Sequence, residues 1–252
     1  MTQDPPVAAT EPPPGTPPPP EAGPPRIPFV AVIAAVAGAL ILIVGGAIAL
    51  RLVMPDANII GLLVVEAAGL IFAVYAAVVR LPGIGWSGVG LRPAPAIWTW
   101  LAIPIAFGAM IVAAALTYAV LYAIGEIDTN PQLKALAPAA FGGLWAKLGL
   151  IAMAGLVVPF AEELLFRGVL YTWLRQHLGF IAVAVITSAL FAVAHLLPSR
   201  VIGFFVVGMF AAYLREKSNS IWPSVVLHAS FNSLNLAILL FLAPLLKDQL
   251  AG

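Results

Sequence analysis

Cysteine is absent from the 252-residue sequence, which excludes disulfides, thiolate metal sites and cysteine nucleophiles. Charged residues are scarce: they make up 9% of the chain, whereas a soluble domain has about 25%. The formal net charge is only +1 and the sequence has no basic cluster, so we exclude nucleic acid as a partner. Hydrophobic residues make up 62% of the chain. This balance predicts an integral membrane protein in contact with membrane lipid.

The N-terminal segment differs from the rest of the chain. Residues 1–27 are rich in proline and include the run EPPPGTPPPPEAGPP. Proline favours an extended chain, and the segment has too few apolar residues to form a core, so we expect a disordered tail. We interpret it as a tether rather than as a ligand for an SH3-like domain. Residues 28–143 are predicted to form N-terminal transmembrane helices and loops, and residues 144–246 a transmembrane core.

Seven segments are apolar enough to be transmembrane helices, which need about 20 mainly apolar residues each. They comprise residues 29–50, 59–79, 97–124, 144–174, 180–197, 201–214 and 221–246. We expect Pro104 to bend the third and Pro159 the fourth. The last segment has four polar residues near its middle, so it could divide and give eight helices. The predicted fold class is all-α, a polytopic membrane protein.

The fourth segment contains the stretch PFAEELLFRG, which places three ionisable side chains in apolar surroundings. Such groups are costly at bilayer depth and mark functional sites there. Glu163 and Arg167 are four residues apart, so they share a helix face and can pair. Glu162 lies about 100° further round the helix and has no partner on it. We therefore regard Glu162 as the residue available for chemistry.

Two histidines lie in later apolar segments. His195 ends the run FAVAH, one helical turn after Phe191, and His228 lies one turn before Asn232 in the run HASFN. A short turn near residue 178 joins the fourth and fifth segments. Glu162 lies 16 residues before that turn and His195 lies 17 residues after it, so the two side chains should have the same depth. We expect the three helices to present these groups to one cavity.

The motifs EELLFR, FAVAH and HASFN, in this order, resemble those of the CPBP family, also called the Abi family, which includes CAAX proteases and bacteriocin-processing enzymes. The resemblance covers residues 144 to about 240 and implies a CAAX-protease-like helical core. It also implies a hydrolase, an intramembrane endopeptidase that cleaves a membrane-associated peptide or protein. The resemblance implies Glu162 as general base, His195 as the group that orients water, and His228 with Asn232 as the oxyanion site. The supporting residues that it implies are Glu163, Arg167 and Phe191.

The residues leave the role of a metal open. Glu162, His195 and His228 could bind Zn²⁺ with water as the fourth ligand, as in a metalloprotease. The sequence lacks the H-E-x-x-H pattern, and a glutamate and a histidine can also activate water without a metal. We favour the metal-free, glutamate-type protease and keep Zn²⁺ as the alternative.

Two other functions remain open. One is a non-catalytic membrane protein of the same scaffold, acting in bacteriocin self-immunity or as an adaptor for a partner protein. The other is a proton- or ion-coupled transporter that uses Glu66 with Glu162 and the histidines. The unpaired Glu162 argues against a pure adaptor, and the lack of internal repeats argues against a transporter. We expect a multi-pass protein of a bacterial cell membrane, and the residues leave open whether its substrate is prenylated.

Overall fold

The computed structural model describes residues 26–125 and 142–242. Their secondary structure is helical, and no strand occurs in these two ranges, which confirms the predicted all-α class. The predicted proline-rich tail lies outside the described residues except for Arg26 and Ile27, and Ile27 is buried. The division into residues 28–143 and 144–246 stays a prediction.

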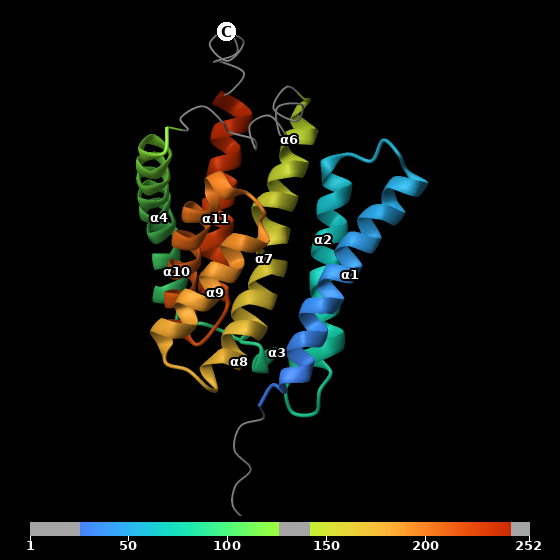
Figure 1. The fold of residues 1–252 in the computed structure, drawn as a ribbon, viewed down its shortest axis with the longest axis vertical. Coiled ribbons are helices and arrows are strands. Elements are labelled where there is room, and N and C mark those ends of the chain that lie inside the picture. The colour runs from blue at the N-terminus through green and yellow to red at the C-terminus, as the bar shows by residue number, and fades with distance from the viewer. Residues whose placement is uncertain (1–25, 126–141, 243–252) are drawn as a thin grey trace, which may run out of the picture.

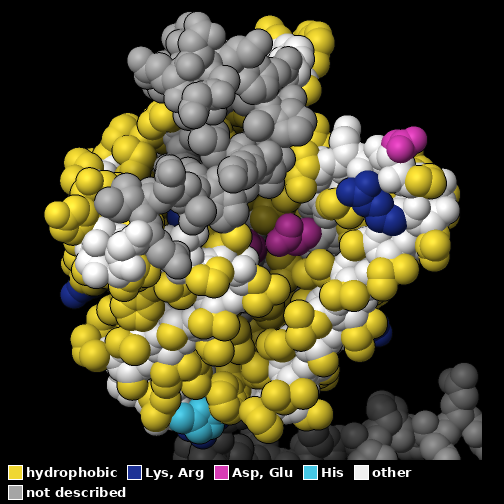
Figure 2. Space-filling model, turned by 45° about the horizontal axis from the view of Figure 1, so that its top comes forward, with side chains coloured by type: hydrophobic (Ala, Val, Ile, Leu, Met, Phe, Trp, Pro, Cys, Tyr) yellow, Lys and Arg dark blue, Asp and Glu magenta, His cyan; other side chains and the backbone are white. Residues whose placement is uncertain are grey.

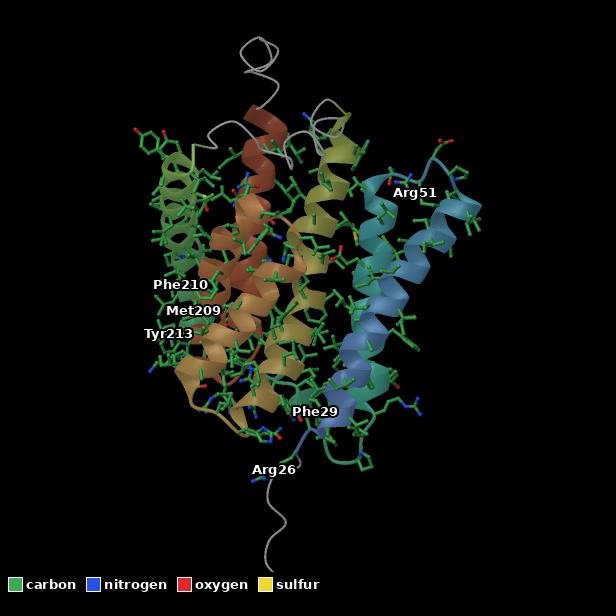
Figure 3. The ribbon with its side chains drawn as sticks, viewed as in Figure 1. Arg26, Phe29, Arg51, Met209, Phe210 and Tyr213 are labelled. Atoms are coloured by element: carbon green, nitrogen blue, oxygen red, sulfur yellow. The ribbon has the colours of Figure 1, made fainter. Side chains whose placement is uncertain are left out.

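The chain begins with the helix pair α1 (Phe29–Val53) and α2 (Ile59–Val74), which lie side by side (Figure 1). The π-helical turn η1 (Tyr75–Val79) extends α2. The Asn58 side chain caps α2 by accepting a hydrogen bond from the Gly61 amide at 3.2 Å. In Figure 3, Arg26 lies where α1 begins and Arg51 lies near its other end. The helix therefore has a basic residue at each end of its apolar span.

A second group of helices packs through small side chains. The short α3 (Gly85–Gly88) is followed by α4 (Ala96–Ala123), which contacts α10 (Val201–Ser218) and α11 (Trp222–Leu242). The buried residues of α4 are all alanines spaced by three or four residues, and small side chains let helix backbones approach closely. They are Ala102, Ala106, Ala109 and Ala113. Pro104 lies inside α4, and the helix continues past it.

The central element is one long helix, Leu144–Arg175, which lies between the α1–α2 pair and helices α10 and α11 (Figure 1). Two π-helical stretches interrupt its α-helical hydrogen bonding. Its parts in order are α6 (Leu144–Leu150), η2 (Ile151–Val157), α7 (Val158–Glu163), η3 (Leu164–Leu170) and α8 (Tyr171–Arg175). The short α7, with Glu162 and Glu163, thus has a π-helical stretch on each side.

Pro159 follows the first π-helical stretch directly. Proline has no N–H, so the carbonyl of Gly155, four residues earlier, loses its α-helical donor. The Ser233 hydroxyl of α11 donates to this carbonyl at 3.3 Å. The place where the backbone is interrupted is therefore also a place where α11 binds the long helix.

The turn after α8 leads into α9 (Phe180–Ala194), then into the short 3₁₀ turn η4 (Pro198–Arg200) and α10. The helix α9 packs against both α8 and α10. This arrangement confirms the short connection that the sequence predicted between the fourth and fifth segments.

Five described helices are long and apolar enough to cross a membrane, and large apolar side chains cover much of the outer surface. They are Phe29–Val53, Ile59–Val79, Ala96–Ala123, Leu144–Arg175 and Trp222–Phe241. The two other predicted segments are helical but less typical: α9 has 15 residues, and α10 ends in the charged run Arg215, Glu216 and Lys217. The protein is therefore an integral, multi-pass membrane protein.

The predicted break in the last segment does not occur, since α11 is one helix from Trp222 to Leu242. Its central polar side chains find partners instead of ending the helix. Asn232 donates to the Ala154 carbonyl, Ser233 to the Gly155 carbonyl, and Asn235 to a carbonyl of its own helix. Satisfied polar groups are tolerated inside a membrane helix, so α11 stays whole.

Candidate active site

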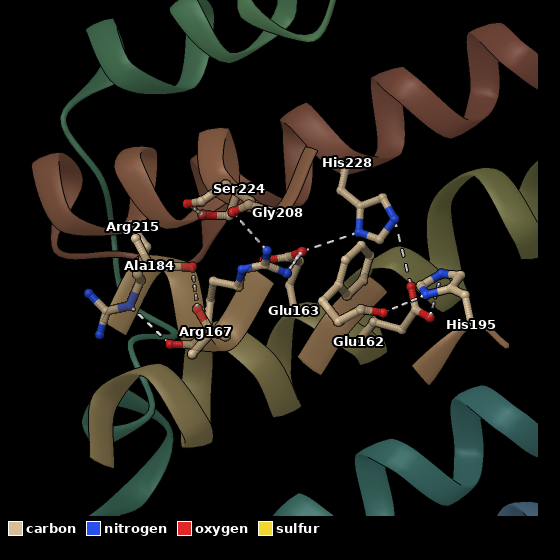
Figure 4. Close-up of polar contacts among 12 residues, drawn as sticks. Glu162, Glu163, Arg167, Ala184, His195, Gly208, Arg215, Ser224 and His228 are labelled. Carbon is tan, nitrogen blue, oxygen red and sulfur yellow. Dashed lines mark hydrogen bonds and ion pairs between the residues drawn. The ribbon is translucent and has the colours of Figure 1, made fainter. Parts of the chain in front are cut away.

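The carboxylate of Glu162 lies between two imidazoles that come from different helices (Figure 4). Its Oε1 is 3.7 Å from His195 Nε2, and its Oε2 is 3.7 Å from His228 Nε2. Glu162 is only 8% exposed. His195 follows the end of α9 and His228 lies in α11. The structure thus confirms that Glu162 and His195 meet across the helical hairpin and adds His228 to the pair.

The hydrogen bonds of both rings fix which nitrogen faces Glu162. His195 Nδ1 is 2.8 Å from the Phe191 carbonyl, and His228 Nδ1 is 3.2 Å from Glu163 Oε1. A carbonyl or a carboxylate can only accept, so each Nδ1 carries a hydrogen. In the neutral rings each Nε2 therefore has a free lone pair. The 3.7 Å separations are too long for direct hydrogen bonds, so Glu162 can bind a third group such as water.

The neighbouring carboxylate, Glu163, is neutralised. Its Oε1 is 2.7 Å from Nη1 of Arg167, and both side chains are fully buried. Arg167 also donates from Nη2 to the Gly208 carbonyl of α10 at 3.0 Å. The predicted pairing of Glu163 and Arg167 is confirmed, and it extends to a third helix. Because His228 donates to the same Oε1, this pair also holds one of the two histidines.

Phe191 is buried at the centre of these groups. Its ring lies edge-on to His195 and to His228, with centroid distances of 4.6 and 5.3 Å. The Cζ atom of Arg167 lies 4.9 Å from the same ring. Phe191 therefore separates the ion pair from the two imidazoles, which agrees with the supporting role that the family resemblance implies.

Asn232 lies in α11 one turn after His228. Its Nδ2 donates to the carbonyl of Ala154 in η2 at 3.1 Å. Among the described hydrogen bonds this is the one that the Asn232 side chain makes, and it leaves a second N–H on the amide. The amide is therefore fixed against the long helix, and its role at an oxyanion stays a prediction.

Sequence reasoning missed Phe204 of α10. Its ring stacks on the His195 imidazole with a centroid distance of 3.9 Å and an interplanar angle of 26°. No motif spacing connects the two residues, since they lie on either side of η4. The contact depends on how α9 and α10 pack, and a single sequence does not give that geometry.

Acidic side chains lie in a hollow among hydrophobic ones, between the α1–α2 pair and the rest of the bundle (Figure 2). Glu66 of α2 is partly buried and interacts electrostatically with Glu162. The helix that carries Glu66 packs against α7. The sequence assigned Glu66 no place in the site, and the structure brings it near the reactive carboxylate.

The donor atoms of Glu162, His195 and His228 suit a metal such as Zn²⁺. Metal-bound histidines commonly donate from their other nitrogen to a carbonyl or a carboxylate, as both rings do here. Within residues 26–125 and 142–242, however, no group of three His, Asp or Glu side chains is arranged so that it could hold an ion. The donor chemistry therefore fits a metal, and the arrangement of the side chains does not.

The site lies inside a segment that matches a known family. Residues 143–234 match the family model described as type II CAAX prenyl endopeptidase Rce1-like. The matched segment includes Glu162, His195, His228 and Asn232, and it runs from α6 into α11. No curated protein and no solved structure matches the chain. Over residues 143–234 the chain has the scaffold of a CAAX-type intramembrane protease and belongs to the CPBP family.

Proposed function

We propose that this protein is an intramembrane endopeptidase that hydrolyses a peptide bond of a membrane-associated peptide or protein. The observation that carries the proposal is the position of the Glu162 carboxylate, 3.7 Å from Nε2 of both His195 and His228 inside a helical bundle. Amide hydrolysis needs an activated water and donors for the developing oxyanion. It needs no serine or cysteine nucleophile. The match to a CAAX endopeptidase family supports the same reaction class.

Glu162 acts as the general base. It accepts a proton from a bound water while the water oxygen attacks the scissile carbonyl carbon. The lone pair of His195 Nε2 accepts a hydrogen bond from the same water and orients it. When the C–N bond breaks, the proton held by Glu162 passes to the leaving nitrogen. The products are a carboxylate and an amine.

His228 and Asn232 stabilise the oxyanion. Nδ1–H of His228 is directed at Glu163, so donation from Nε2 requires the imidazolium form, in which both nitrogens carry hydrogen. Its positive charge then lies 3.7 Å from the Glu162 carboxylate, which offsets part of the cost of burying either charge. The second N–H of the Asn232 amide supplies the other donor.

A metal is the alternative source of the activated water. Zn²⁺ held by Glu162, His195 and His228 would polarise the scissile carbonyl and activate a bound water. We favour the metal-free reaction because each of the three side chains then has a separate task. Elemental analysis of the purified protein distinguishes the two. One zinc ion per chain, lost in His195→Ala, would overturn our preference.

The proposal is tested by cleavage of a panel of membrane-anchored peptides by the protein in proteoliposomes. We expect Glu162→Gln to lower kcat by about 10²- to 10⁴-fold, because the base is lost while the size of the side chain is kept. Asp56→Asn, in the loop after α1, is the matched control and should cleave like the wild type. Equal cleavage by wild type and Glu162→Gln would refute the site. No cleavage by either variant, with partner binding unaffected, would favour the adaptor function.

A further inference from the structure

His195 has little backbone support for its orientation. The helix α9 ends at Ala194, and His195 occupies the position after its last residue. The next residue, Leu196, has a φ of 52°, so the chain turns sharply away from the helix there. One hydrogen bond, from Nδ1 to the Phe191 carbonyl, holds the ring from its own helix.

That hydrogen bond does not fix the plane of the imidazole. The torsion that rotates a histidine ring has broad minima, so a ring held at Nδ1 alone can tilt. A tilt moves Nε2, because this atom lies on the far side of the ring from the hydrogen bond. In the proposed reaction Nε2 orients the attacking water, so the tilt of the ring affects catalysis directly.

Two phenylalanines form a corner around the ring. Phe204 stacks on its face at 3.9 Å with an interplanar angle of 26°, and Phe191 meets it edge-on at 4.6 Å. Phe191 and Phe204 are themselves perpendicular, with an interplanar angle of 90°. The hydrogen bond and Phe191 come from the same helix as His195. Phe204 alone among these contacts comes from α10.

We propose that Phe204 is a positioning residue: its ring fixes the plane of His195 so that Nε2 faces Glu162. This inference rests on the proposed endopeptidase function. A flat aromatic ring is required at position 204, because a branched aliphatic side chain fills a similar volume without presenting a face. Phe204 also packs against the main apolar core, so its effect on catalysis has to be separated from an effect on stability.

Three variants separate these effects. We expect Phe204→Leu to lower kcat by about 10- to 100-fold with KM little changed, since a small misplacement of a catalytic group has an effect of this size. Phe204→Tyr keeps a flat ring and should stay within a few-fold of wild type. The matched control is Phe210→Leu in the same helix, which packs toward α4 and carries one of the labels in Figure 3. It should retain wild-type kcat.

A spectroscopic measurement tests the stack without requiring cleavage. A ring stacked at 3.9 Å shifts the proton signals of the imidazole, and His195 is identified in histidine-labelled protein by the signal that His195→Gln removes. We expect Phe204→Leu to abolish this shift and Phe204→Tyr to keep it. An unchanged His195 signal in Phe204→Leu would overturn the inference, as would equal losses of kcat in the Leu and Tyr variants. Failure of the proposed function would instead show as Glu162→Gln cleaving like wild type.

Discussion

Among single residues, the adjacent carboxylates of Glu162 and Glu163 have opposite surroundings. Glu163 is bound by Arg167 and by His228, whereas Glu162 faces two nitrogens at a distance too long for direct hydrogen bonds. One carboxylate is committed to holding helices together. The other is left to bind whatever enters the site.

The buried pair is expected to depend on both of its members. Arg167→Met leaves the Glu163 carboxylate buried without its cation, so we expect it to lower the free energy of unfolding by about 3–5 kcal/mol. The double variant Glu163→Gln with Arg167→Met carries no buried charge, and a glutamine oxygen can still accept from His228. It should be clearly more stable than Arg167→Met. Thermal unfolding in detergent measures both, and equal losses would show that packing rather than charge is responsible.

Sequence spacing predicted these residue contacts where the backbone alone decides them. The separation of Glu163 and Arg167 is one helical turn, and Glu162 and His195 are equally far from a short turn. Phe204 and Ser233 were not predicted, because their contacts depend on how α10 and α11 cross their neighbours. Neither crossing leaves a periodic signal in the sequence.

At the scale of elements, the contact between η2 and α11 brings the last helix to the site. Asn232 and Ser233 donate to successive carbonyls of η2, one of which Pro159 has deprived of its helical donor. Gly155 allows this approach, since a Cβ there would lie 2.5 Å from Ser233 Oγ and 3.3 Å from its Cα. His228 is carried on the same helix, so the crossing also sets its distance from Glu162.

We therefore expect Gly155→Ala to push α11 away from the long helix. Overpacking of this kind costs about 1–3 kcal/mol, and activity should fall with it because His228 moves away from Glu162. Gly108→Ala in α4 is the matched control, since nothing lies within 4 Å of the added Cβ. It should leave both the unfolding temperature and cleavage unchanged or raise stability slightly. A fully active Gly155→Ala protein would show that α11 tolerates displacement.

At the scale of the whole molecule, a polar cluster ties the ends of α8 and α10. Arg175 Nη2 is 3.0 Å from Glu216 Oε1, and Tyr171 donates to the same carboxylate. Arg92, before α4, donates to the Asn219 carbonyl at 2.6 Å, and the Ile221 amide donates to the Gly90 carbonyl. These bonds link the loop before α4 to the turn between α10 and α11, at the opposite end from Arg51.

Glu216 makes part of this tie dependent on pH. It lies beyond Leu214, where the apolar part of α10 ends, and the hydrogen bond from Arg175 lowers the pKa of its carboxyl below the usual 4.5. A lowered pKa in the folded protein stabilises the fold above the usual value and loses that contribution as the pH falls through the folded pKa. Wild type should exceed Glu216→Gln in unfolding free energy at neutral pH by less than about 1 kcal/mol, since the pair is partly exposed. The difference should vanish in acid, and a difference that grew on acidification would contradict this assignment.

The sequence predicted the order and extent of the membrane helices, because apolar length is a direct signal. It was wrong about a division of α11, because polar residues there are satisfied by neighbouring backbone that a single segment does not reveal. It could not predict that the α1–α2 pair packs on α7, or that this brings Glu66 near Glu162. Apolar helices carry little information about which neighbours they choose.

The two π-helical stretches beside α7 have a consequence for how the gene can change. A π-turn holds one residue more than an α-turn, so each stretch resembles a tolerated single-residue insertion. Loss of one residue within Ile151–Val157 can be absorbed by a return to α-helical bonding. The same loss within Val158–Glu163 would rotate Glu162 by about 100° away from the histidines. Length variation is therefore expected on either side of the reactive carboxylate and not in the single turn that carries it.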